Sequence, residues 1–527
     1  MMKKTYLFLL AAMTLFAGCQ EKDEIFEDPY AGGKEALGIK MDPNVPASPV
    51  GGLPGTEVTI RAAGLVPYKD QLEFAFNGTP AEVLEVSETQ IKVKVPSFAS
   101  TGVVSVSIGN QVFFGPKFTV RGKINIDPSF RAVAGTDGGI NQVLPLVDGR
   151  YLILGNFTNY DNKGVVKKLN RIVMTTKDGD LDRSPRFGEA ANGQLTSAVQ
   201  ASNKFVIAGG FSGFDEQTGK ISNITRLNNN GTIDTMSVTT YTDSLIWVPV
   251  FNGGTDQGIN ELFLQGDKII GVGNFRYHVS RIYDQPTYDL EADSIILDSV
   301  EMRQVVRFNM DGSLDKTYHF DDSKEMGFRA ANGPVRDSYM DEEGRLILVG
   351  NFTTFDGEPA GSIVRLTADG KLDESFQAGS GTSEAISSIT YNEQTEKYLI
   401  TGNFRSYNGT AVSGMALLNK DGSLDASFQP GEIGGGYVYY AKQLSDGMII
   451  ASGGFQEYNK VRRNGFMILD KTGKLMEGYN STGPLNGSLT GVLETEAGSG
   501  ERALLLTGYF YYFDDRQVNN IIRVTLD

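Results

Sequence analysis

The chain has 527 residues, 63 of them glycine, and a formal net charge of −16. So acidic a surface repels nucleic acid and anionic membranes, which excludes binding driven by their charge. The single cysteine excludes an intrachain disulfide and a cysteine-based zinc site, and the two histidines leave little material for a histidine-based metal site or a Ser-His-Asp triad. We therefore predict no metal, no cofactor and no nucleic-acid partner.

The first eighteen residues predict an export signal, because two lysines precede a short apolar run and then small residues. The apolar run is too short to span a bilayer as a helix. It ends in Phe-Ala-Gly-Cys19, which resembles a bacterial lipobox. The resemblance implies that Cys19 is acylated and becomes the mature N-terminus. The alternative is an ordinary secretory leader that contains a cysteine by chance.

Residues 19–41 predict a flexible tether, since they contain a Gly-Gly pair and no hydrophobic periodicity. The tether opens with Gln-Glu-Lys-Asp-Glu at 20–24, an acidic segment directly after the acylation site. That arrangement resembles the surface-export signal of Bacteroides-type outer-membrane lipoproteins. It implies a protein that is anchored by lipid to the outer membrane and faces the cell exterior.

Residues 42–121 predict a small β-sandwich, because four alternating strands lie between glycine-rich and proline-rich turns. The sequence Gly-Thr-Glu-Val-Thr-Ile at 55–60, Phe-Asn-Gly-Thr-Pro-Ala at 76–81 and Thr-Gln-Ile-Lys-Val-Lys-Val-Pro at 89–96 resembles the IPT/TIG immunoglobulin-like family. In surface lipoproteins such a domain implies a spacer, and we assign no chemistry to it.

Residues 122–527 contain a sevenfold repeat: an apolar run, Gly, any residue, Phe, two spacers, an aromatic residue and Asp or Asn. A period just above fifty residues is the signature of a repeat architecture. The anchor phenylalanines are Phe157, Phe211, Phe275, Phe352, Phe404, Phe455 and Phe510.

A second phrase, Asp-Gly-x-Leu-Asp-x-Ser-Phe, alternates with the first, so each unit predicts four strands, as in one propeller blade. The segment 122–130 carries the outer-strand phrase with no blade before it, and the chain stops after a third strand. We therefore predict an all-β fold, in which the sandwich precedes a seven-bladed β-propeller closed by pairing of its first and last strands. The two phrases resemble the delta-sixty repeat family of bacterial propeller proteins, a resemblance that implies the fold and no catalytic residue.

The repeated residues themselves are predicted to have a structural role. The anchor phenylalanines are expected to wedge between blades, and the second aromatic of the phrase, kept by internal repetition, is expected to be structural. An Asp-Gly phrase could supply carboxylates to calcium, but Asp before Gly is first a turn signal. We interpret these phrases as hairpin turns.

Departures from the repeat are better candidates for function, since insertions in repeat proteins lie in loops on one face. Two insertions flank Phe275, at about 236–257 and 277–302. Because the four strands of a blade form a meander, both insertions are expected to emerge on the same rim of the ring, which is also the rim where the chain enters blade six. Exposed aromatic side chains there could stack on sugars, or could pack the insertions onto the blade. The candidate ligand-binding residues are Trp247, Tyr241, Phe251, Tyr277, His278, Tyr283, Tyr437 and Tyr439.

Three functions of different class remain. The first is a non-catalytic surface lipoprotein that binds a polysaccharide or oligosaccharide, since the whole arrangement resembles accessory proteins of polysaccharide-utilisation systems. That resemblance implies an outer-membrane transporter and a substrate-capturing lipoprotein as partners. The second is a protein-interaction or adhesin propeller. The third is a glycosidase or lyase, which would need two suitably spaced carboxylates. No sialidase-type Ser-x-Asp-x-Gly-x-Thr-Trp box is present, and we predict no catalytic residue.

Overall fold

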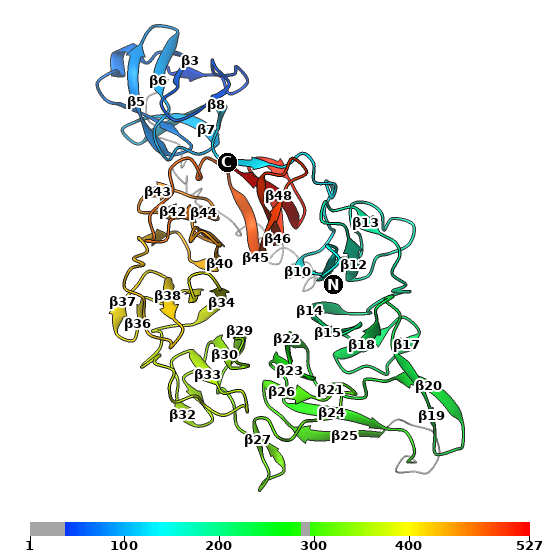
Figure 1. Cartoon of the computed structure of the whole chain (residues 1–527). Helices are drawn as coiled ribbons and strands as arrows, with labels where there is room; N and C mark the ends of the chain where they lie inside the picture. The colour runs from blue at the N-terminus through cyan, green and yellow to red at the C-terminus, as the bar shows by residue number, and fades with distance from the viewer. Residues whose placement is uncertain (1–36, 286–295) are drawn as a thin grey trace, which may run out of the picture.

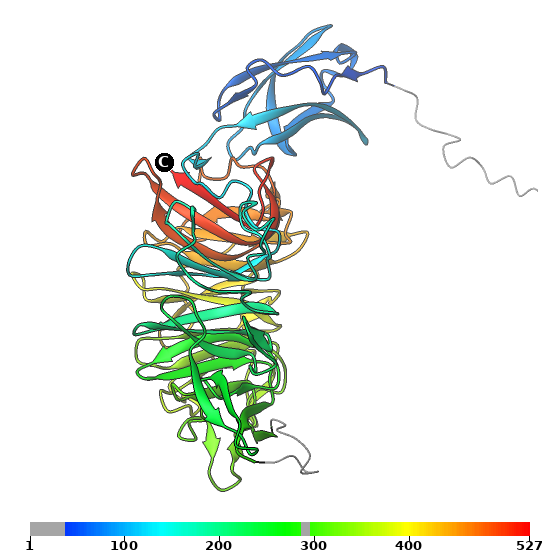
Figure 2. The same cartoon turned by 90° about the vertical axis from the view of Figure 1, so that its right-hand side faces the viewer.

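The computed structural model describes residues 37–285 and 296–527. It shows a ring of β-sheets around a central axis, with the N-terminal domain attached at the outer edge of the ring (Figure 1). Seen from the side, the ring is a flat disc and the N-terminal domain is tilted away from its plane (Figure 2). The predicted leader, the acylation site at Cys19 and the tether as far as residue 36 lie outside the described residues.

The N-terminal domain is one hydrogen-bonded path of eight strands in the order β1-β3-β6-β5-β4-β7-β8-β2. Its elements are β1 Lys40–Met41, β2 Gly51–Gly52, β3 Glu57–Ala63, the 3-10 turn η1 Val66–Tyr68, β4 Leu72–Phe76, β5 Thr79–Val86, β6 Gln90–Lys94, β7 Gly102–Ile108 and β8 Gln111–Val120. Alternate residues of β3, β6 and β7 point inward, so that Val58, Ile60 and Val93 are fully buried. The domain begins two residues before the expected boundary, because Lys40 and Met41 pair with β3.

Seven antiparallel sheets, numbered 1 to 7 along the chain, form the ring, which is a β-propeller. Sheet 1 is β10 Ile140–Pro145, β11 Tyr151–Gly155, β12 Ile172–Thr175 and β13 Leu181–Asp182; sheet 2 is β14 Gln194–Ala201, β15 Lys204–Gly210 and β18 Ile224–Asn228; sheet 3 is β22 Ile259–Gln265, β23 Lys268–Gly273 and β26 Val305–Phe308; sheet 4 is β29 Val335–Met340, β30 Leu346–Gly350 and β33 Ile363–Leu366. Sheet 5 is β34 Ile386–Asn392, β35 Lys397–Gly402 and β38 Met415–Asn419; sheet 6 is β40 Val438–Gln443, β41 Ile449–Gly453 and β44 Phe466–Leu469; sheet 7 is β45 Leu485–Glu496, β46 Arg502–Phe513, β48 Ile521–Leu526 and β9 Ile124–Ile126.

The fourth strand of most sheets is shorter than the sequence indicates. In sheets 2 to 6 it is reduced to one bridge, such as Leu366 with Leu372 or Leu418 with Leu424. Only sheets 1 and 7 have a fourth strand of two or more residues among the described residues, and in sheet 7 this strand is β9, which pairs with β48 through Val524 and Ile126. The first strand after the N-terminal domain therefore completes the sheet that ends the chain.

Short hairpins extend the sheets outward. They are β16 Gly213–Phe214 with β17 Gln217–Thr218, β31 Thr354–Phe355 with β32 Glu358–Pro359, β36 Ser406–Tyr407 with β37 Thr410–Ala411, β39 Ile433–Gly434 with β42 Glu457–Tyr458 and β43 Val461–Arg462, and β47 Arg516–Gln517 beside β46. The insertions around Phe275 form β19 Thr235–Thr239 with β20 Leu245–Pro249, and β21 Gly254–Thr255 with β24 Tyr277–Ile282 and β25 Ile296–Glu301, while β27 Phe320–Asp321 and β28 Met326–Gly327 follow sheet 3.

The repeated aromatic residues form the core between sheets, as predicted. All seven anchor phenylalanines are buried. The second aromatic of the phrase is fully buried wherever it occurs. Where it is a tyrosine, its hydroxyl has a fixed partner: Tyr407 donates a hydrogen bond of 2.6 Å to the carbonyl of Gly422, and Tyr160 donates one of 2.8 Å to that of Gly179. Burial raises the pKa of these phenols, so they remain donors.

Replacing Tyr407 with phenylalanine is expected to reduce the free energy of unfolding by about 1 kcal/mol, because the carbonyl of Gly422 loses its buried donor while the ring still fits. Denaturant unfolding followed by circular dichroism measures the change. Tyr241→Phe is the matched control, since Tyr241 is exposed. Equal stabilities for the two variants would contradict a structural role for this hydroxyl.

The Asp-Gly phrases are turns, which confirms the interpretation from the sequence. The carboxylate of Asp421 accepts hydrogen bonds from the backbone N–H of Ser423 at 2.9 Å and from its hydroxyl at 2.6 Å. Gly422 lies between them with φ of +86°, a conformation that favours glycine. Asp311, with Ser313, repeats the arrangement. The carboxylates of these turns are already occupied by local donors.

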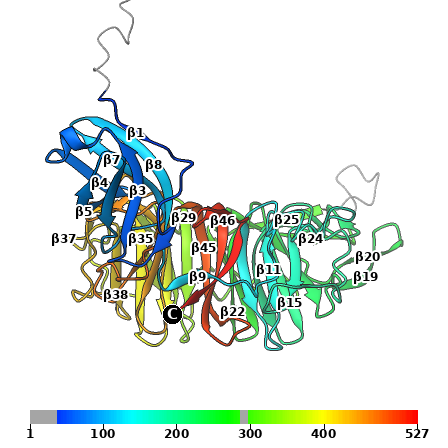
Figure 3. The same ribbon diagram turned by 90° about the horizontal axis from the view of Figure 1, so that it is seen from above.

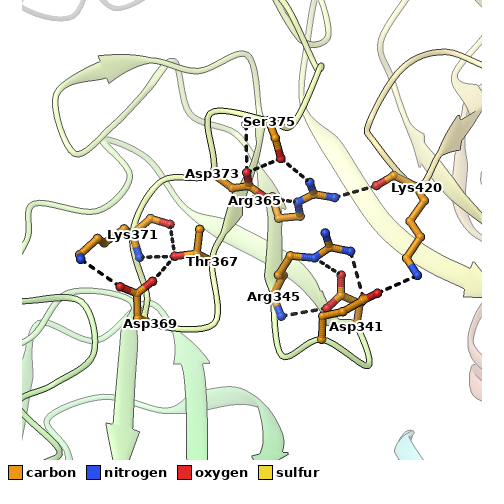
Figure 4. A network of polar contacts seen from close by, with 10 residues as sticks. Asp341, Arg345, Arg365, Thr367, Asp369, Lys371, Asp373, Ser375 and Lys420 are labelled. Atoms are coloured by element: carbon orange, nitrogen blue, oxygen red, sulfur yellow. Dashed lines mark hydrogen bonds and ion pairs between the residues drawn. The ribbon is translucent and has the colours of Figure 1, made fainter.

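An arginine links each of several sheets to the next. In sheet 4 the guanidinium of Arg365 lies 2.6 Å from Asp373, donates a hydrogen bond of 2.7 Å to the carbonyl of Lys420 in the turn of sheet 5, and stacks on Phe376 (Figure 4). Burial alone would raise the pKa of Asp373, but hydrogen bonds from Ser375 and Arg365 hold it below its ordinary value. The buried Arg523 pairs with Asp127 in the same way, and the half-buried Arg226 and Arg307 pair with Asp234 and Asp315. The second Asp of the repeated phrase therefore serves to connect blades.

The N-terminal domain contacts sheets 6 and 7 through polar groups. Thr101 donates its backbone N–H to the carbonyl of Ser481 at 2.8 Å, and Lys117 lies 2.6 Å from the carboxylate of Asp515. Arg463 donates to the carbonyl of Phe98 at 2.8 Å. The N-terminal domain is therefore attached to the ring at sheets 6 and 7.

Candidate functional site

The innermost strands of all seven sheets surround a central cavity of about 510 Å³. Each of these strands carries an irregularity near its start, as between Ile140 and Gln142 or between Val335 and Asp337. The polar side chains at these positions bond to the neighbouring sheet: Asn141 donates to the carbonyl of Leu195 at 2.6 Å, and Thr490 donates to that of Ile140 at 2.7 Å. Many polar groups of the wall are thus already used to connect sheets.

Two carboxyl groups meet in this cavity, Glu261 from β22 and Asp337 from β29. They are hydrogen-bonded to each other, the hydroxyl of Ser338 donates to Glu261, and the backbone N–H of Ile389 donates to Asp337 at 2.8 Å. Desolvation and the neighbouring carboxylate raise the pKa of Glu261 well above its ordinary value, and desolvation also raises that of Asp337. The pKa values of both carboxyl groups are therefore raised above those of exposed carboxyl groups.

Carboxyl groups in hydrogen-bond contact lie closer together than the separation of about 5 Å or more that glycosidases use. The pair in the central cavity does not have that spacing. Among the described residues, no group of three or more His, Cys, Asp or Glu side chains is arranged to hold a metal ion. Both side chains are half-buried and form an acidic pair in the wall of the central cavity.

A second cavity, of about 560 Å³, opens on the rim between sheets 6 and 7. We call it the rim groove. Tyr439 belongs to β40 and also lines the central cavity, so the two cavities adjoin, and the exposed Tyr511 comes from β46. Next to them lie Tyr437, whose ring meets that of Tyr439 edge to face at 4.7 Å, and Tyr509, whose hydroxyl donates to Asn141 at 2.6 Å.

The rim groove contains no charged residue. Its polar lining consists of the side chains of Gln456, Asn464, Asn486 and Ser488, and none of these four side chains makes a hydrogen bond within the described part of the chain. Gly454 brings the backbone close to the hydroxyl of Tyr439, where a Cβ atom would lie 2.3 Å from that oxygen. The groove therefore presents aromatic faces and uncommitted amide and hydroxyl groups side by side.

The structure brings together only part of the predicted site. Tyr439 lines both the rim groove and the central cavity, and Tyr437 contacts its ring. Trp247 and Tyr241 instead lie on the hairpin β19–β20, which projects from the outer edge of the ring, far from β40 and β45 (Figures 1 and 3). Both side chains are exposed, and Trp247 shows 59% of its surface. They are available for contact but form a separate surface.

Phe251 and His278 are corrections to the predicted site, because both are buried. Phe251 packs against Phe308 in the core of sheet 3, with ring centres 5.7 Å apart. His278 places a ring nitrogen 3.1 Å from the carbonyl of Gly312, and burial lowers its pKa. His278 takes the place that the second aromatic occupies in the other sheets, so the repeat continues there in altered form.

The two insertions do touch each other, as predicted. Asn252 of the first accepts a hydrogen bond of 2.9 Å from the backbone N–H of Arg281 in the second, and donates one of 2.8 Å to its carbonyl. Tyr277 lies half-buried beside Arg276, and Tyr283 lies half-buried near Arg281, with its pKa raised by burial. None of these residues borders the rim groove.

Tyr509 and Tyr511 were not predicted, although a signal for them was present. The copy of the repeat at Phe510 reads Gly-Tyr-Phe-Tyr-Tyr-Phe, richer in tyrosine than any other copy. The strands β45 and β46 also run for twelve residues each, past the point at which the corresponding strands of other sheets end. This extension raises two tyrosines to the rim.

Comparison with protein families supports the two-part architecture. Residues 15–116 match the family described as domain of unknown function DUF5008. Residues 344–376 and 396–428 match the family described as domain of unknown function DUF5122, a β-propeller. The second match covers the two clearest copies of the repeat. No curated protein matches the chain.

Three solved structures illustrate the comparison, and all are distant in sequence. The WD40 β-propeller domain of Doa1 is 14% identical with a TM-score of 0.40, over 76% of this chain and 96% of that one. The computationally designed protein Ika8 is 9% identical with a TM-score of 0.39, over 91% and 99%. A structural genomics protein of unknown function from Bacteroides thetaiotaomicron is 10% identical with a TM-score of 0.24, over 93% and 100%.

Within residues 37–285 and 296–527, no helix has the length and apolar character needed to cross a membrane.

Proposed function

We propose that this protein is a non-catalytic lipoprotein of the cell surface that binds a neutral polysaccharide or oligosaccharide for a glycan-uptake system. The ligand lies in the rim groove, and the N-terminal domain acts as a spacer. The observation that carries the proposal is the lining of the groove, where exposed tyrosines adjoin amide and hydroxyl side chains without partners and no charged residue is present.

The chemistry of a sugar ring fits this lining. A pyranose has an apolar C–H face, which gains most by stacking on an aromatic ring, and a rim of hydroxyls that need hydrogen-bond partners when they leave water. Tyr439 and Tyr511 offer the rings, and Asn464 and Asn486 offer both donors and acceptors. A neutral ligand is also unaffected by the net charge of −16, which would oppose an anionic polymer.

The proposed cellular location rests on the sequence. We propose that Cys19 carries the lipid anchor, that the tether and the N-terminal domain hold the propeller away from the outer membrane, and that an outer-membrane transporter with its substrate-capturing lipoprotein are the partners. Support comes from the lipobox-like leader and the acidic segment that follows it.

The variants Tyr439→Ala and Tyr511→Ala are each expected to weaken binding to the recognised polysaccharide about tenfold or more, since each removes a stacking ring. Affinity gel electrophoresis against a panel of neutral polysaccharides identifies the ligand, and calorimetry measures the affinities. Phe114→Ala is the matched control, because Phe114 is an exposed aromatic residue of the N-terminal domain. Unchanged binding by both tyrosine variants would contradict the proposed site, and a panel without any binding would contradict the ligand class.

The hairpin β19–β20 supports a second candidate function, a protein-interaction or adhesin role. Leu245 and Trp247 lie on the same face of this hairpin and are largely exposed, and exposed apolar patches mark contact surfaces. The variant Trp247→Ala distinguishes the two surfaces. If it abolished polysaccharide binding while Tyr439→Ala did not, the sugar site would lie on the hairpin instead.

A further inference from the structure

Sheet 1 departs from the repeat at two places. The first is the loop after its second aromatic residue. In sheets 4, 5, 6 and 7 the third strand begins eight residues after that aromatic, as Ile363 follows Phe355, whereas in sheet 1 Ile172 follows Tyr160 by twelve. The added residues include Lys167 and Lys168, both exposed.

The second departure is in the outer phrase. Where Asp373 and Asp425 are followed three residues later by Phe376 and Phe428, Asp182 is followed five residues later by Phe187. The longer phrase reads Asp-Arg-Ser-Pro-Arg-Phe and contributes Arg183 and Arg186, again both exposed. Two lengthened segments of one sheet thus carry four exposed cations in an acidic protein.

The structure brings both insertions to the same cavity, of about 360 Å³, which is lined by residues of sheet 1 and of the segment that leads from it to sheet 2. Lys167, Lys168, Arg183 and Arg186 all line it. None of the four forms a salt bridge within residues 37–285 and 296–527. The single acidic residue of the lining, Asp182, already pairs with Arg150 at 2.6 Å.

The lining of the cavity also includes apolar residues. Met174 from β12 is buried, and Leu181 and Phe187 are half-buried. Cations of one sign around a low-dielectric wall concentrate an attractive potential for anions. Apolar residues in the same lining favour an anion that also has an apolar body.

We propose that this cavity binds a small organic anion, a carboxylate or sulfonate attached to an aromatic or branched aliphatic group. The charged group lies among the four cations, and the apolar group lies against Met174, Leu181 and Phe187. This site is separate from the rim groove, and the proposal does not depend on the proposed function.

Fluorescence titration with anilinonaphthalene sulfonate tests the proposal, because this probe combines a sulfonate with an aromatic body. A saturable site with a stoichiometry of one is expected. The double variant Lys168→Glu with Arg186→Glu is expected to weaken that site about tenfold or more, and raising the salt concentration is expected to weaken it in the wild type. The control is Lys471→Glu with Lys474→Glu, a pair of exposed lysines in the turn of sheet 6.

Two competitors test the two halves of the ligand. Neutral phenylnaphthylamine and inorganic sulfate are each expected to compete weakly, since each has only one of the required features. Equal affinity for the charge-reversed and control variants would overturn the proposal. Phenylnaphthylamine that binds as tightly as the sulfonate would also overturn it, because the pocket would then be purely apolar. Poly-glutamate that displaces the probe more effectively than other anionic aromatic compounds do would overturn it too, because the ligand would then be an acidic polypeptide.

Discussion

Replacing Arg523 with alanine is expected to reduce the free energy of unfolding by about 3–5 kcal/mol, the typical result of removing one partner from a buried ion pair. Arg523 is fully buried in β48, and its guanidinium lies 2.5 Å from Asp127 and 2.9 Å from Asp178. It also donates a hydrogen bond of 3.0 Å to Ser129. Without the arginine, Asp127 remains buried with one fewer donor.

The position of Arg523 explains why its loss should be felt across the whole ring. Asp127 follows β9, the first strand of the propeller, whereas Arg523 belongs to the last strand, and Asp178 belongs to sheet 1. One side chain therefore joins the first and last strands of the propeller to the neighbouring sheet. Hydrogen bonds from Ser129 and Arg523 hold the pKa of Asp127 below its ordinary value, although burial opposes this.

Arg150→Ala is the matched control, since Arg150 pairs with Asp148 and Asp182 at a partly exposed site. Pairs of that kind contribute about 0–1 kcal/mol. Denaturant unfolding of both variants and the wild type gives the comparison. If Arg523→Ala were no more destabilising than Arg150→Ala, the buried link would not hold the ring closed.

The acidic pair in the central cavity is expected to make stability depend on pH in a particular direction. The pKa of Glu261 is raised in the folded protein by desolvation and by Asp337. Above the ordinary carboxyl range the unfolded chain has lost this proton, while the folded protein still binds it. Stability should therefore fall as pH rises from about 4.5, by up to about 1.4 kcal/mol per pH unit, until the folded pKa is passed.

Glu261→Gln is expected to remove this slope and to be more stable than the wild type at pH 8, because an amide can still donate to Asp337 and takes up no proton on folding. Carboxylates with lowered pKa values, such as Asp321 at about 2, titrate below this window. Burial also raises the pKa of Asp514, which adds to the fall in stability, and lowers the pKa of His278, which opposes it below about pH 6.5. The difference between the profiles of the wild type and Glu261→Gln therefore isolates the contribution of the pair. Thermal unfolding between pH 5 and pH 9 measures the profile.

Glu73→Gln is the control for this experiment, since Glu73 is exposed on the N-terminal domain. Its profile should follow that of the wild type. A Glu261→Gln profile with the same slope as the wild type would contradict a raised pKa of Glu261 in the folded protein.

The fold could be predicted because the same local features occur in seven copies of the repeat. The anchor phenylalanines and the Asp-Gly turns are local features, and seven copies average out the errors of any one. Where a copy is eroded, as at His278, the prediction failed. His278 looked like a break in the repeat, but it is a buried substitute for the missing aromatic, and burial is set by the neighbouring sheet.

The site was harder to predict because its parts come from different sheets. Tyr439 belongs to sheet 6 and Tyr511 to sheet 7, and only the stacking of neighbouring sheets places them on one groove. The same is true of Glu261 with Asp337, and of Arg365 with the turn of sheet 5. Sequence spacing fixes positions within a sheet, but the register between sheets follows from packing. Phe251 shows the reverse case, an aromatic in an insertion that folds back into the core.

The measurement that tests the central proposal most directly is a crystal structure of the protein with the oligosaccharide that the panel identifies. We expect a sugar ring stacked on Tyr439 or Tyr511, with hydroxyls bonded to the side chains of Asn464 and Asn486. A sugar bound instead on the hairpin β19–β20, with the rim groove empty, would contradict the proposed site.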